Sequence, residues 1–351
     1  MKTTIVTTTV RVPVFLTAYY ENAKRFGHEV DFVVAGDLKS DNFETEKFCD
    51  TIPNCVYLSP RSQKRYLLES PLYALPWNSP CRRNVAILWA YNGGADVIIT
   101  LDDDNLATEY DAIGNHTFYL GLNKLPHLWR SKVGKWTNVC SLLQERNNVE
   151  FYHRGFPPGQ RWKEDFIDLT VDGDRRVVVN AGLWTGDPDT DAITRLERPL
   201  RVDGFKDLAP PKIFLAPGTW SPFNCQNTAL AREIIPAYFL NPMIGRHDDI
   251  FAGYIINRLA EHFGHVIAFG TPLAFHDRSP HDLWKDLDQE RTGMQLTDSF
   301  VTALRDMKLT ARNYHEGFGQ IIEKLEECVF SRFDNAKAFM THMRNWHEVF
   351  K

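Results

Sequence analysis

Three consecutive carboxylates, Asp102, Asp103 and Asp104, are the residues of this chain best suited to chemistry. They follow residues 96–101, a short apolar run that predicts a buried parallel strand, and ligands of open α/β sheets bind at the carboxyl ends of such strands. Because side chains alternate along a strand, Asp102 and Asp104 are expected to face one way and Asp103 the other. Two carboxylates on one side suit a hard divalent cation, which in turn clamps a nucleotide diphosphate. The alternative is a solvated acidic turn, although adjacent carboxylates repel one another unless a cation offsets their charge.

Arg82, Arg83 and Asn84 open the helix that leads to this strand. Arginines at a helix start oppose the helix dipole, so a ligand would explain them better than helix stability does. An anionic diphosphate is such a ligand, and these three residues are predicted to contact it. A surface ion pair is the alternative.

His276, Arg278 and His281 follow a later predicted strand, residues 266–269. Imidazole suits Mn²⁺ better than Mg²⁺, so His276 is a candidate third metal ligand beside the acids. A structural histidine is the alternative. Arg278 and His281 are predicted either to close over phosphates or to lie in a solvated loop.

Two further acidic pairs precede predicted helices. Asp248 and Asp249 come directly before a strongly apolar helix, so one is expected to cap it while the other serves as a general base. Asp189 and Asp191 are expected to cap a helix that begins near Ala192.

The elements that must position these residues alternate between strands and helices along the first hundred residues, which predicts an α/β fold with helices on both faces of an open sheet. Strands are expected at 3–10, 30–35, 96–101, 175–180 and 266–269, and helices at 15–23, 85–92 and 249–263. Residues 105–178 are expected to be loops that face a substrate. Apolar side chains repeat with helical spacing from residue 298 onward, through Val329 and Phe333. We therefore divide the chain into a catalytic domain, 1–285, and a helical extension, 286–351, packed on it.

Composition and motifs argue against several classes of function, nucleic-acid binding among them. The 351 residues carry 45 carboxylates against 40 Lys and Arg, so nothing marks a nucleic-acid-binding surface. The six cysteines form no C-x-x-C pair, and neither a signal peptide nor an apolar run of about 18 residues is present. A cytoplasmic protein without a membrane span is predicted. No P-loop, G-x-G-x-x-G or G-x-S-x-G motif occurs.

Together these segments resemble the reversibly glycosylated polypeptides, a plant family that includes UDP-arabinopyranose mutases and has a GT-A-like glycosyltransferase fold, a mixed Rossmann-type sheet. Asp102-Asp103-Asp104 looks like the DDD element that holds a divalent ion and the UDP-sugar. His153-Arg154-Gly155-Phe156-Pro157 is similar to the segment with the glycosylated arginine, which makes Arg154 the candidate here. Gly182-Leu183-Trp184 and Arg246-His247-Asp248-Asp249 match two further blocks, and Trp184 is counted among the residues that bind the UDP-sugar. Residues 82–105 also look like the STELLO-type glycosyltransferases.

The resemblance implies a nucleotide-sugar enzyme, and the main hypothesis is a metal-dependent glycosyltransferase that moves a sugar from a UDP-sugar to a hydroxyl acceptor. Asp102 would contact the sugar or ribose, while Asp104 and His276 would hold Mn²⁺ or Mg²⁺. Asp248 or Asp249 would deprotonate the acceptor, a glycan, small molecule or protein. A UDP-sugar pyranose/furanose mutase is the first alternative; a silent nucleotide-sugar-binding protein and a nucleotidyltransferase are the others. The donor sugar, the stereochemistry and a homo-oligomer stay open.

Overall fold

The computed structural model of the chain describes residues 1–351 except 122–124, 126, 133–134, 164–165, 171–173 and 329–332. The strands are β1 (Thr3–Thr8), β2 (Val30–Ala35), β3 (Cys55–Leu58), β4 (Val97–Leu101), β5 (Asn105–Leu106), β6 (Leu128–Ser131), β7 (Leu143–Glu145), β8 (Ile167–Thr170), β9 (Val177–Gly186), β10 (Val202–Phe205), β11 (Lys212–Leu215), β12 (Asn227–Ala231) and β13 (Val266–His276). The α-helices are α1 (Leu16–Phe26), α2 (Asn42–Cys49), α3 (Pro60–Tyr66), α4 (Arg83–Asn92), α5 (Ala112–Thr117), α6 (Ala192–Glu197), α7 (Asp248–Phe263), α8 (Leu283–Asp306), α9 (Tyr314–Cys328) and α10 (Ala336–Glu348). Short 3-10 helices are η1 (Pro71–Ala74), η2 (Pro80–Arg82), η3 (Val139–Leu142), η4 (Pro158–Gln160), η5 (Arg232–Ala237) and η6 (Pro242–His247).

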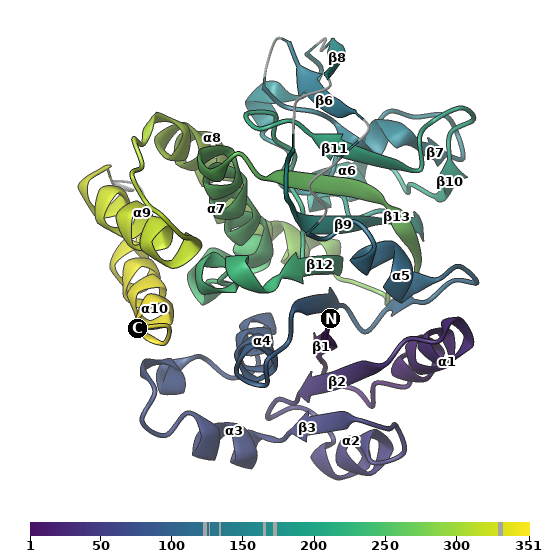
Figure 1. Cartoon of the computed structure of the whole chain (residues 1–351), viewed down its shortest axis with the longest axis vertical. Helices are drawn as coiled ribbons and strands as arrows, with labels where there is room; N and C mark the ends of the chain where they lie inside the picture. The colour runs from purple at the N-terminus through teal and green to yellow at the C-terminus, as the bar shows by residue number, and fades with distance from the viewer. Residues whose placement is uncertain (122–124, 126, 133–134, 164–165, 171–173, 329–332) are drawn as a thin grey trace.

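The described strands form one mixed sheet whose main order is β3-β2-β1-β4-β12-β9-β13-β11-β6-β8 (Figure 1). β1, β2, β3 and β4 run parallel to one another. β12 is antiparallel to both β4 and β9, and β13 runs parallel to β9. The carboxyl ends of β1, β2, β4, β9 and β13 therefore lie at the same edge of the sheet as the amino end of β12.

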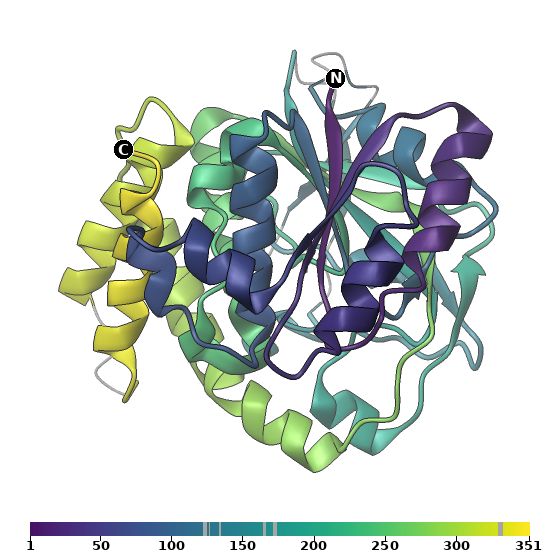
Figure 2. The ribbon, with the colours of Figure 1, turned by 90° about the horizontal axis from the view of Figure 1, so that it is seen from below.

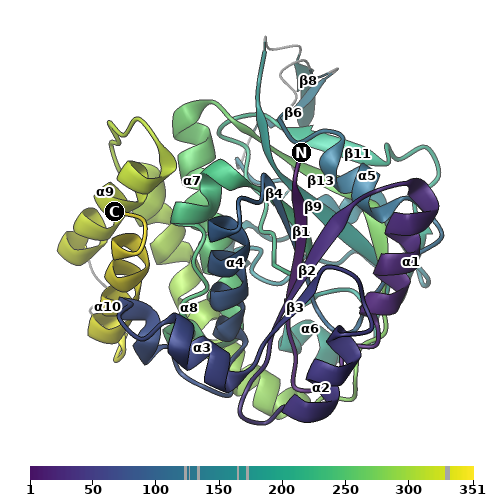
Figure 3. The same cartoon turned by 60° about the horizontal axis from the view of Figure 1, so that its bottom comes forward.

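Helices cover both faces of the sheet, as Figure 3 shows with α4 and α7 on one side and α1 and α5 on the other. The side chains of β2 show why both faces need covering: successive side chains of a strand point to opposite faces, and those of β2 are apolar on both. Val33 joins a core with residues of α4 and α7, whereas Phe32 and Val34 join a second core with residues of α1 and α5. The expected α/β class, a mixed sheet flanked by helices, is confirmed.

The last helices pack on the larger core. Phe318, Ile321, Met343 and Trp346 are buried in the same apolar cluster as α4 and α7. Figures 1 and 2 show α9 and α10 side by side at one end of the molecule. The division of the chain at residue 285 stays a prediction. Among the described residues, no helix combines the length and the apolar character needed to cross a bilayer.

Most of the expected elements are present, with some differences in length. β2 matches the expected strand, and α4 and α7 match the expected helices. β9 and β13 extend well beyond the expected strands 175–180 and 266–269, so His276 is the last residue of β13 instead of following it. The expected loop region 105–178 also contains strands and α5. Val329, expected in a helix, lies outside the described residues.

Candidate active site

The loops that carry the predicted site residues meet at one edge of the sheet. The turn after β4 carries the three acids, β13 ends at His276, and the segment before β12 carries Cys225 and Gln226. Register fixes their proximity, because His276 pairs with Gly186 of β9 and with Asn105 of β5. This edge is where open α/β sheets bind their ligands.

A cavity of about 370 Å³ opens at this edge. Its walls come from the loops after β1, β2, β4 and β13 and from the start of η2. The lining residues are Thr8, Thr9, Val10, Arg11, Asp37, Asn78, Ser79, Pro80, Arg83, Asp102, Asp103, Asp104, Ser279 and His281. Five of the predicted site residues thus line one cavity: Arg83, Asp102, Asp103, Asp104 and His281.

The three consecutive acids have three different sets of partners. Asp102 accepts from Arg83 Nη2 at 2.5 Å, and Asp104 Oδ2 lies 3.3 Å from His276 Nε2. Asp103 contacts the loop after β1. The expected alternation does not hold here because β4 ends at Leu101 and the acids form a turn, closed by a hydrogen bond from the Asn105 amide to the Asp102 carbonyl at 3.2 Å.

Asp104 and His276 form a pair of donors that fits a divalent cation. His276 Nδ1 donates to the Asp187 carbonyl at 2.6 Å, which fixes the orientation of the ring and directs Nε2 toward Asp104. Metal-binding histidines are commonly oriented by such a second hydrogen bond. Burial alone would raise the pKa of Asp104, but the hydrogen bond with His276 and the charge of that imidazole hold it below its usual value. No group of three His, Cys, Asp or Glu side chains is assembled as a metal site in the part of the chain that the structure describes, and Asp102 forms an ion pair with Arg83.

Behind the cavity, Arg154 lies between two buried carboxylates. Its Nε donates to both oxygens of Asp189 at 3.1 and 3.2 Å, and Nη1 and Nη2 donate to the two oxygens of Asp249 at 3.1 and 3.2 Å. Nη1 also donates to the Arg246 carbonyl. The segment is fixed locally by Gly155, whose φ of 82° is left-handed and where a Cβ would overlap Ile250 of α7. Each guanidinium nitrogen of Arg154 thus has a carboxylate or carbonyl partner within the protein, and Arg154 fixes the orientation of both aspartates.

Cys225 connects this buried network to the acidic cavity. The Cys225 amide donates to Asp249 Oδ2 at 3.2 Å, and the Cys225 carbonyl accepts from Arg83 Nη1 at 3.2 Å. Arg83 in turn holds Asp102, so the groups between Asp249 and Asp102 are in continuous contact. These hydrogen bonds connect the cavity to the start of α7.

The pKa values of the two aspartates at the start of α7 are shifted in opposite directions. Burial would raise the pKa of Asp249, but the charge of Arg154 and its hydrogen bonds lower it below the usual value. Asp248 has no arginine within ion-pair distance in the described part of the chain, and burial together with the Asp249 charge raises its pKa to about 7. A carboxylate poised near neutrality suits proton transfer, whereas a locked ion pair suits positioning.

Three predicted binding residues are directed away from the cavity. Arg82 donates from Nε to Gln63 at 2.9 Å and stacks on Trp77, while both amide atoms of Asn84 pair with the Leu240 backbone. The Trp184 indole donates to Gln226 at 3.0 Å. Each of these side chains is buried and its polar group is satisfied by the protein itself.

Two other predicted phosphate contacts lie at or near the cavity. His281 lines it and pairs with Asp286 at 3.1 Å. Arg278 is mostly buried beside Asp189 at 3.6 Å. Of the expected helix caps, Asp191 caps α6 by accepting from the Thr194 amide at 2.8 Å, whereas Asp189 pairs with Arg154 instead. Neither Asp248 nor Asp249 caps α7, because both lie in its first turn and His247 occupies the cap position without a side-chain hydrogen bond.

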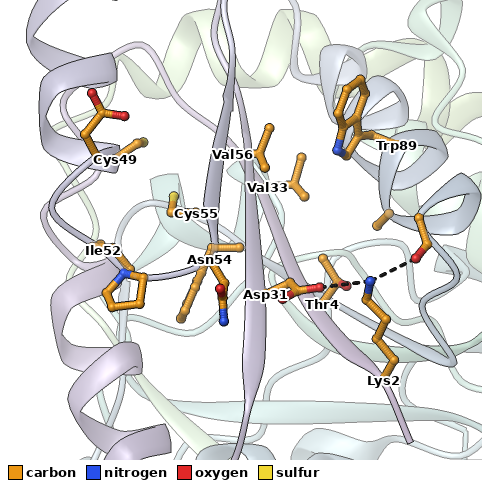
Figure 4. A pocket seen from close by; sticks show the side chains of 15 residues that line it. Lys2, Thr4, Asp31, Val33, Cys49, Ile52, Asn54, Cys55, Val56 and Trp89 are labelled. Atoms are coloured by element: carbon orange, nitrogen blue, oxygen red, sulfur yellow. Dashed lines mark hydrogen bonds and ion pairs between the residues drawn. The ribbon is translucent and has the colours of Figure 1, made fainter.

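A larger cavity of about 520 Å³ lies at the amino ends of β1 and β2, away from the acids (Figure 4). Its lining includes Trp89, Asp31 and Lys2, whose ammonium pairs with Asp31 at 3.2 Å and with the Gly93 carbonyl at 2.9 Å. Lys2 and Asp31 partly neutralise each other, and among the described residues no cluster of carboxylates faces this cavity. The smaller cavity is therefore the better candidate active site, because it combines acids, an imidazole and the ligand-binding edge of the sheet.

Several lining residues were missed by the sequence analysis, among them Arg11, Asp37 and Ser279. Their positions carry a usable signal: Arg11 follows the first strand, Asp37 the second and Ser279 the last. The rule that selected Asp102 applies to all of them.

Comparison with known proteins confirms the resemblance to UDP-arabinopyranose mutases. UDP-arabinopyranose mutase 1 of Arabidopsis thaliana is 30% identical over 184 residues, which are 49% of this chain and 50% of the relative. A probable UDP-arabinopyranose mutase 1 of Pisum sativum is 29% identical over 184 residues, again 49% of this chain and 50% of the relative. The chain spans about half the length of these relatives. A probable UDP-arabinopyranose mutase 2 of Solanum tuberosum is 26% identical over 273 residues, 72% of this chain and 67% of the relative.

No family model matches the chain. Among solved structures, glucosyl-3-phosphoglycerate synthase from Mycobacterium tuberculosis, in complex with Mn²⁺, UDP and phosphoglyceric acid, aligns with a TM-score of 0.44 and 11% identity. The alignment covers 88% of this chain and 80% of that structure.

Proposed function

We propose that this chain is an enzyme that acts on a UDP-sugar, and that it transfers the sugar to a hydroxyl acceptor. The observation that carries the proposal is the acidic cavity at the ligand-binding edge, where Asp104 faces an imidazole of fixed orientation. The similarity to UDP-arabinopyranose mutases supports a nucleotide sugar as the ligand.

Asp104 and His276 would hold the Mn²⁺ or Mg²⁺ that such a reaction uses. A divalent cation supplies charge that stabilises a departing diphosphate. Other groups of the chain hold the site in place: the Asp187 carbonyl fixes the orientation of the His276 ring, and Arg83 holds Asp102. Arg83 thereby leaves Asp102 available to sugar or ribose hydroxyls through its other oxygen.

Asp248 is the stronger candidate for the general base. Its pKa of about 7 lets it accept a proton from an acceptor hydroxyl near neutral pH. Asp249 and Arg154 position the start of α7, because two hydrogen bonds join the Arg154 guanidinium to the Asp249 carboxylate. With its donor groups occupied by Asp189, Asp249 and the Arg246 carbonyl, Arg154 is a positioning residue for the transferase.

A UDP-sugar mutase is the second candidate, favoured by the names of the relatives. It would interconvert pyranose and furanose rings without an acceptor. The acceptor of the transferase, whether glycan, small molecule or protein, and a homo-oligomeric state stay predictions. So does the cytoplasmic location, which is supported by the free thiols of Cys49, Cys55, Cys81, Cys140 and Cys225.

Incubation with a panel of UDP-sugars and Mn²⁺, with and without acceptors, tests the proposal when UDP release and ring form are followed together. UDP release that requires an acceptor and is lost in Asp104→Ala supports transfer. Ring interconversion without net UDP release would assign the mutase activity instead. A wild-type protein that binds neither UDP nor any UDP-sugar would reject both candidates.

A further inference from the structure

Arg11 connects three loops around the acidic cavity. Its Nη1 donates to Ser279 Oγ at 2.9 Å, and its Nη2 lies 3.1 Å from Asp103 Oδ1. Arg11 follows β1, Asp103 follows β4 and Ser279 follows β13, and all three line the cavity. The Arg11 side chain is 56% exposed, so it lies where the cavity opens to solvent.

Asp103 is occupied entirely by this loop. Its Oδ1 pairs with Arg11, and its Oδ2 accepts from Thr9 Oγ1 at 2.7 Å. Thr9 Oγ1 also accepts from the Arg11 amide at 2.9 Å, which ties the carboxylate to the backbone of the loop. Asp103 therefore holds Arg11 at the cavity and has no carboxylate oxygen left unpaired.

The other basic side chains that line the cavity have partners elsewhere in the protein. Arg83 is buried and bound to Asp102 and to the carbonyls of Leu101 and Cys225, and His281 pairs with Asp286. Arg11 has one exposed ion pair, with Asp103, and one hydrogen bond to the Ser279 hydroxyl. Exposed ion pairs contribute little stability, so an anionic ligand can replace these two partners at small cost. A guanidinium also matches phosphate oxygens in a bidentate geometry.

We propose that Arg11 binds the diphosphate of the ligand and that it leaves Asp103 for the phosphate oxygens when the ligand enters. Asp103 is its holding partner in the free protein instead of a ligand contact. This inference rests on the proposed function, since it takes the cavity to be the site of a nucleoside diphosphate. It also reverses the role of Asp103: a direct contact would strengthen binding, whereas a holding partner competes with the ligand for Arg11.

Calorimetric titration of UDP and of uridine separates these roles, with wild type, Arg11→Gln, Asp103→Asn and the double variant, each measured in Mn²⁺ and in EDTA. For Arg11→Gln we expect UDP affinity to fall about tenfold, the loss of a hydrogen-bonded charge, with uridine affinity unchanged. For Asp103→Asn we expect UDP affinity to rise, and to rise much less when Arg11 is already Gln. Arg146→Gln, another exposed arginine paired with an aspartate, Asp203 at 2.7 Å, is the matched control and should leave both affinities unchanged.

Weaker UDP binding in Asp103→Asn, with the unfolding temperature unchanged, would overturn the inference in favour of a direct ligand contact. An Arg11→Gln variant that binds UDP as wild type does would overturn it as well. Equal losses of UDP and uridine affinity in Arg11→Gln would mean that Arg11 only maintains the shape of the cavity, and would also reject the proposal. A wild type that binds no UDP would instead reject the proposed function on which the inference rests.

Discussion

The buried network around Arg154 and the cavity around Asp104 are built from the same residue types for different purposes. Arg154, Asp189 and Asp249 have side chains that are 8%, 5% and 7% exposed, and every guanidinium nitrogen has a carboxylate or carbonyl partner. At the cavity, Arg11, Asp102 and Asp103 are 56%, 40% and 20% exposed. Burial makes the first set rigid, and exposure leaves the second set able to exchange partners.

The comparison teaches that charge alone does not mark the reacting residues. Breaking a buried pair leaves an uncompensated charge in a poorly solvated place, whereas an exposed pair is screened by water. We expect variants of the network to affect folding first and variants of the cavity to affect binding first.

The largest effect is expected for Arg154→Met, which leaves Asp189 and Asp249 buried without their cation. Loss of one partner of a buried pair costs about 3–5 kcal/mol of unfolding free energy. Arg11→Gln should cost less than about 1 kcal/mol because its pair is exposed. Urea denaturation followed by tryptophan fluorescence measures the unfolding free energy of both variants, with Arg146→Gln as a control at an exposed ion pair. Equal losses of unfolding free energy in Arg154→Met and in the control would contradict the distinction between the two regions.

Asp248→Asn should change how stability depends on pH. The pKa of Asp248 is raised to about 7, so the unfolded chain releases this proton near pH 4 while the folded protein retains it. Folded stability therefore falls as pH rises from about 4 to 7, by up to about 4 kcal/mol, since one pKa unit corresponds to about 1.4 kcal/mol. Asparagine removes this penalty.

The unfolding temperature of Asp248→Asn relative to wild type should accordingly increase between pH 5 and pH 8. Activity of the wild type should rise over the same interval as Asp248 loses its proton, and the variant should lack that rise. Asp249→Asn, which disrupts the pair with Arg154, should lower stability at both pH values. Identical pH profiles for wild type and Asp248→Asn would remove Asp248 from the role of base.

Asp104→Ala should abolish the dependence of UDP affinity on Mn²⁺. We expect a loss of at least about tenfold in Mn²⁺, comparable with losses at other metal sites, and little change in EDTA. Titration of UDP in both buffers is the measurement, and Asp203→Ala provides a control at an exposed aspartate. An unaltered Mn²⁺ effect would mean that the cation is held elsewhere.

The smallest effect is expected at the opposite edge of the sheet. Asp31→Asn alters the larger cavity of Figure 4 and breaks the exposed pair with Lys2. UDP affinity should stay within about twofold, because this edge carries no part of the proposed site, and the exposed pair contributes less than about 1 kcal/mol. A large loss of UDP affinity in this variant would move the binding site to the amino ends of the strands.

Sequence periodicity predicted the elements whose buried side chains are mostly apolar, such as β2, α4 and α7. It ended β9 at Asn180, too early, because the glycines that follow, Gly182 and Gly186, are typical of a turn. Asn180 is accommodated through distant partners: its amide donates to His116 Nδ1 at 2.9 Å, and its oxygen accepts from Lys212 at 2.6 Å. Such compensation comes from residues 32 and 64 positions away and leaves no local pattern.

The candidate site was predictable where it depends on the position of a residue after a strand. That rule identified Asp102 to Asp104 and, applied to the first strand, would also have identified Arg11. The pairing of Arg154 with Asp249 across 95 positions depends on how the sheet and α7 pack, which a single sequence does not specify. The same holds for Arg82, whose partner Gln63 comes from α3.

The change from parallel to antiparallel pairing between β4 and β12 also suggests an order in which the strands assemble during folding. β1, β2, β3 and β4 come from the first 101 residues, whereas β12, β9 and β13, which complete the cavity edge, come from residues 177–276. Pairings between distant residues form more slowly than nearby ones, so we expect the parallel block to assemble first and the antiparallel partner to join it later. During refolding, recovery of UDP binding should therefore lag behind the recovery of helical signal, and newly made chains should gain their binding site only after β13 has been synthesised.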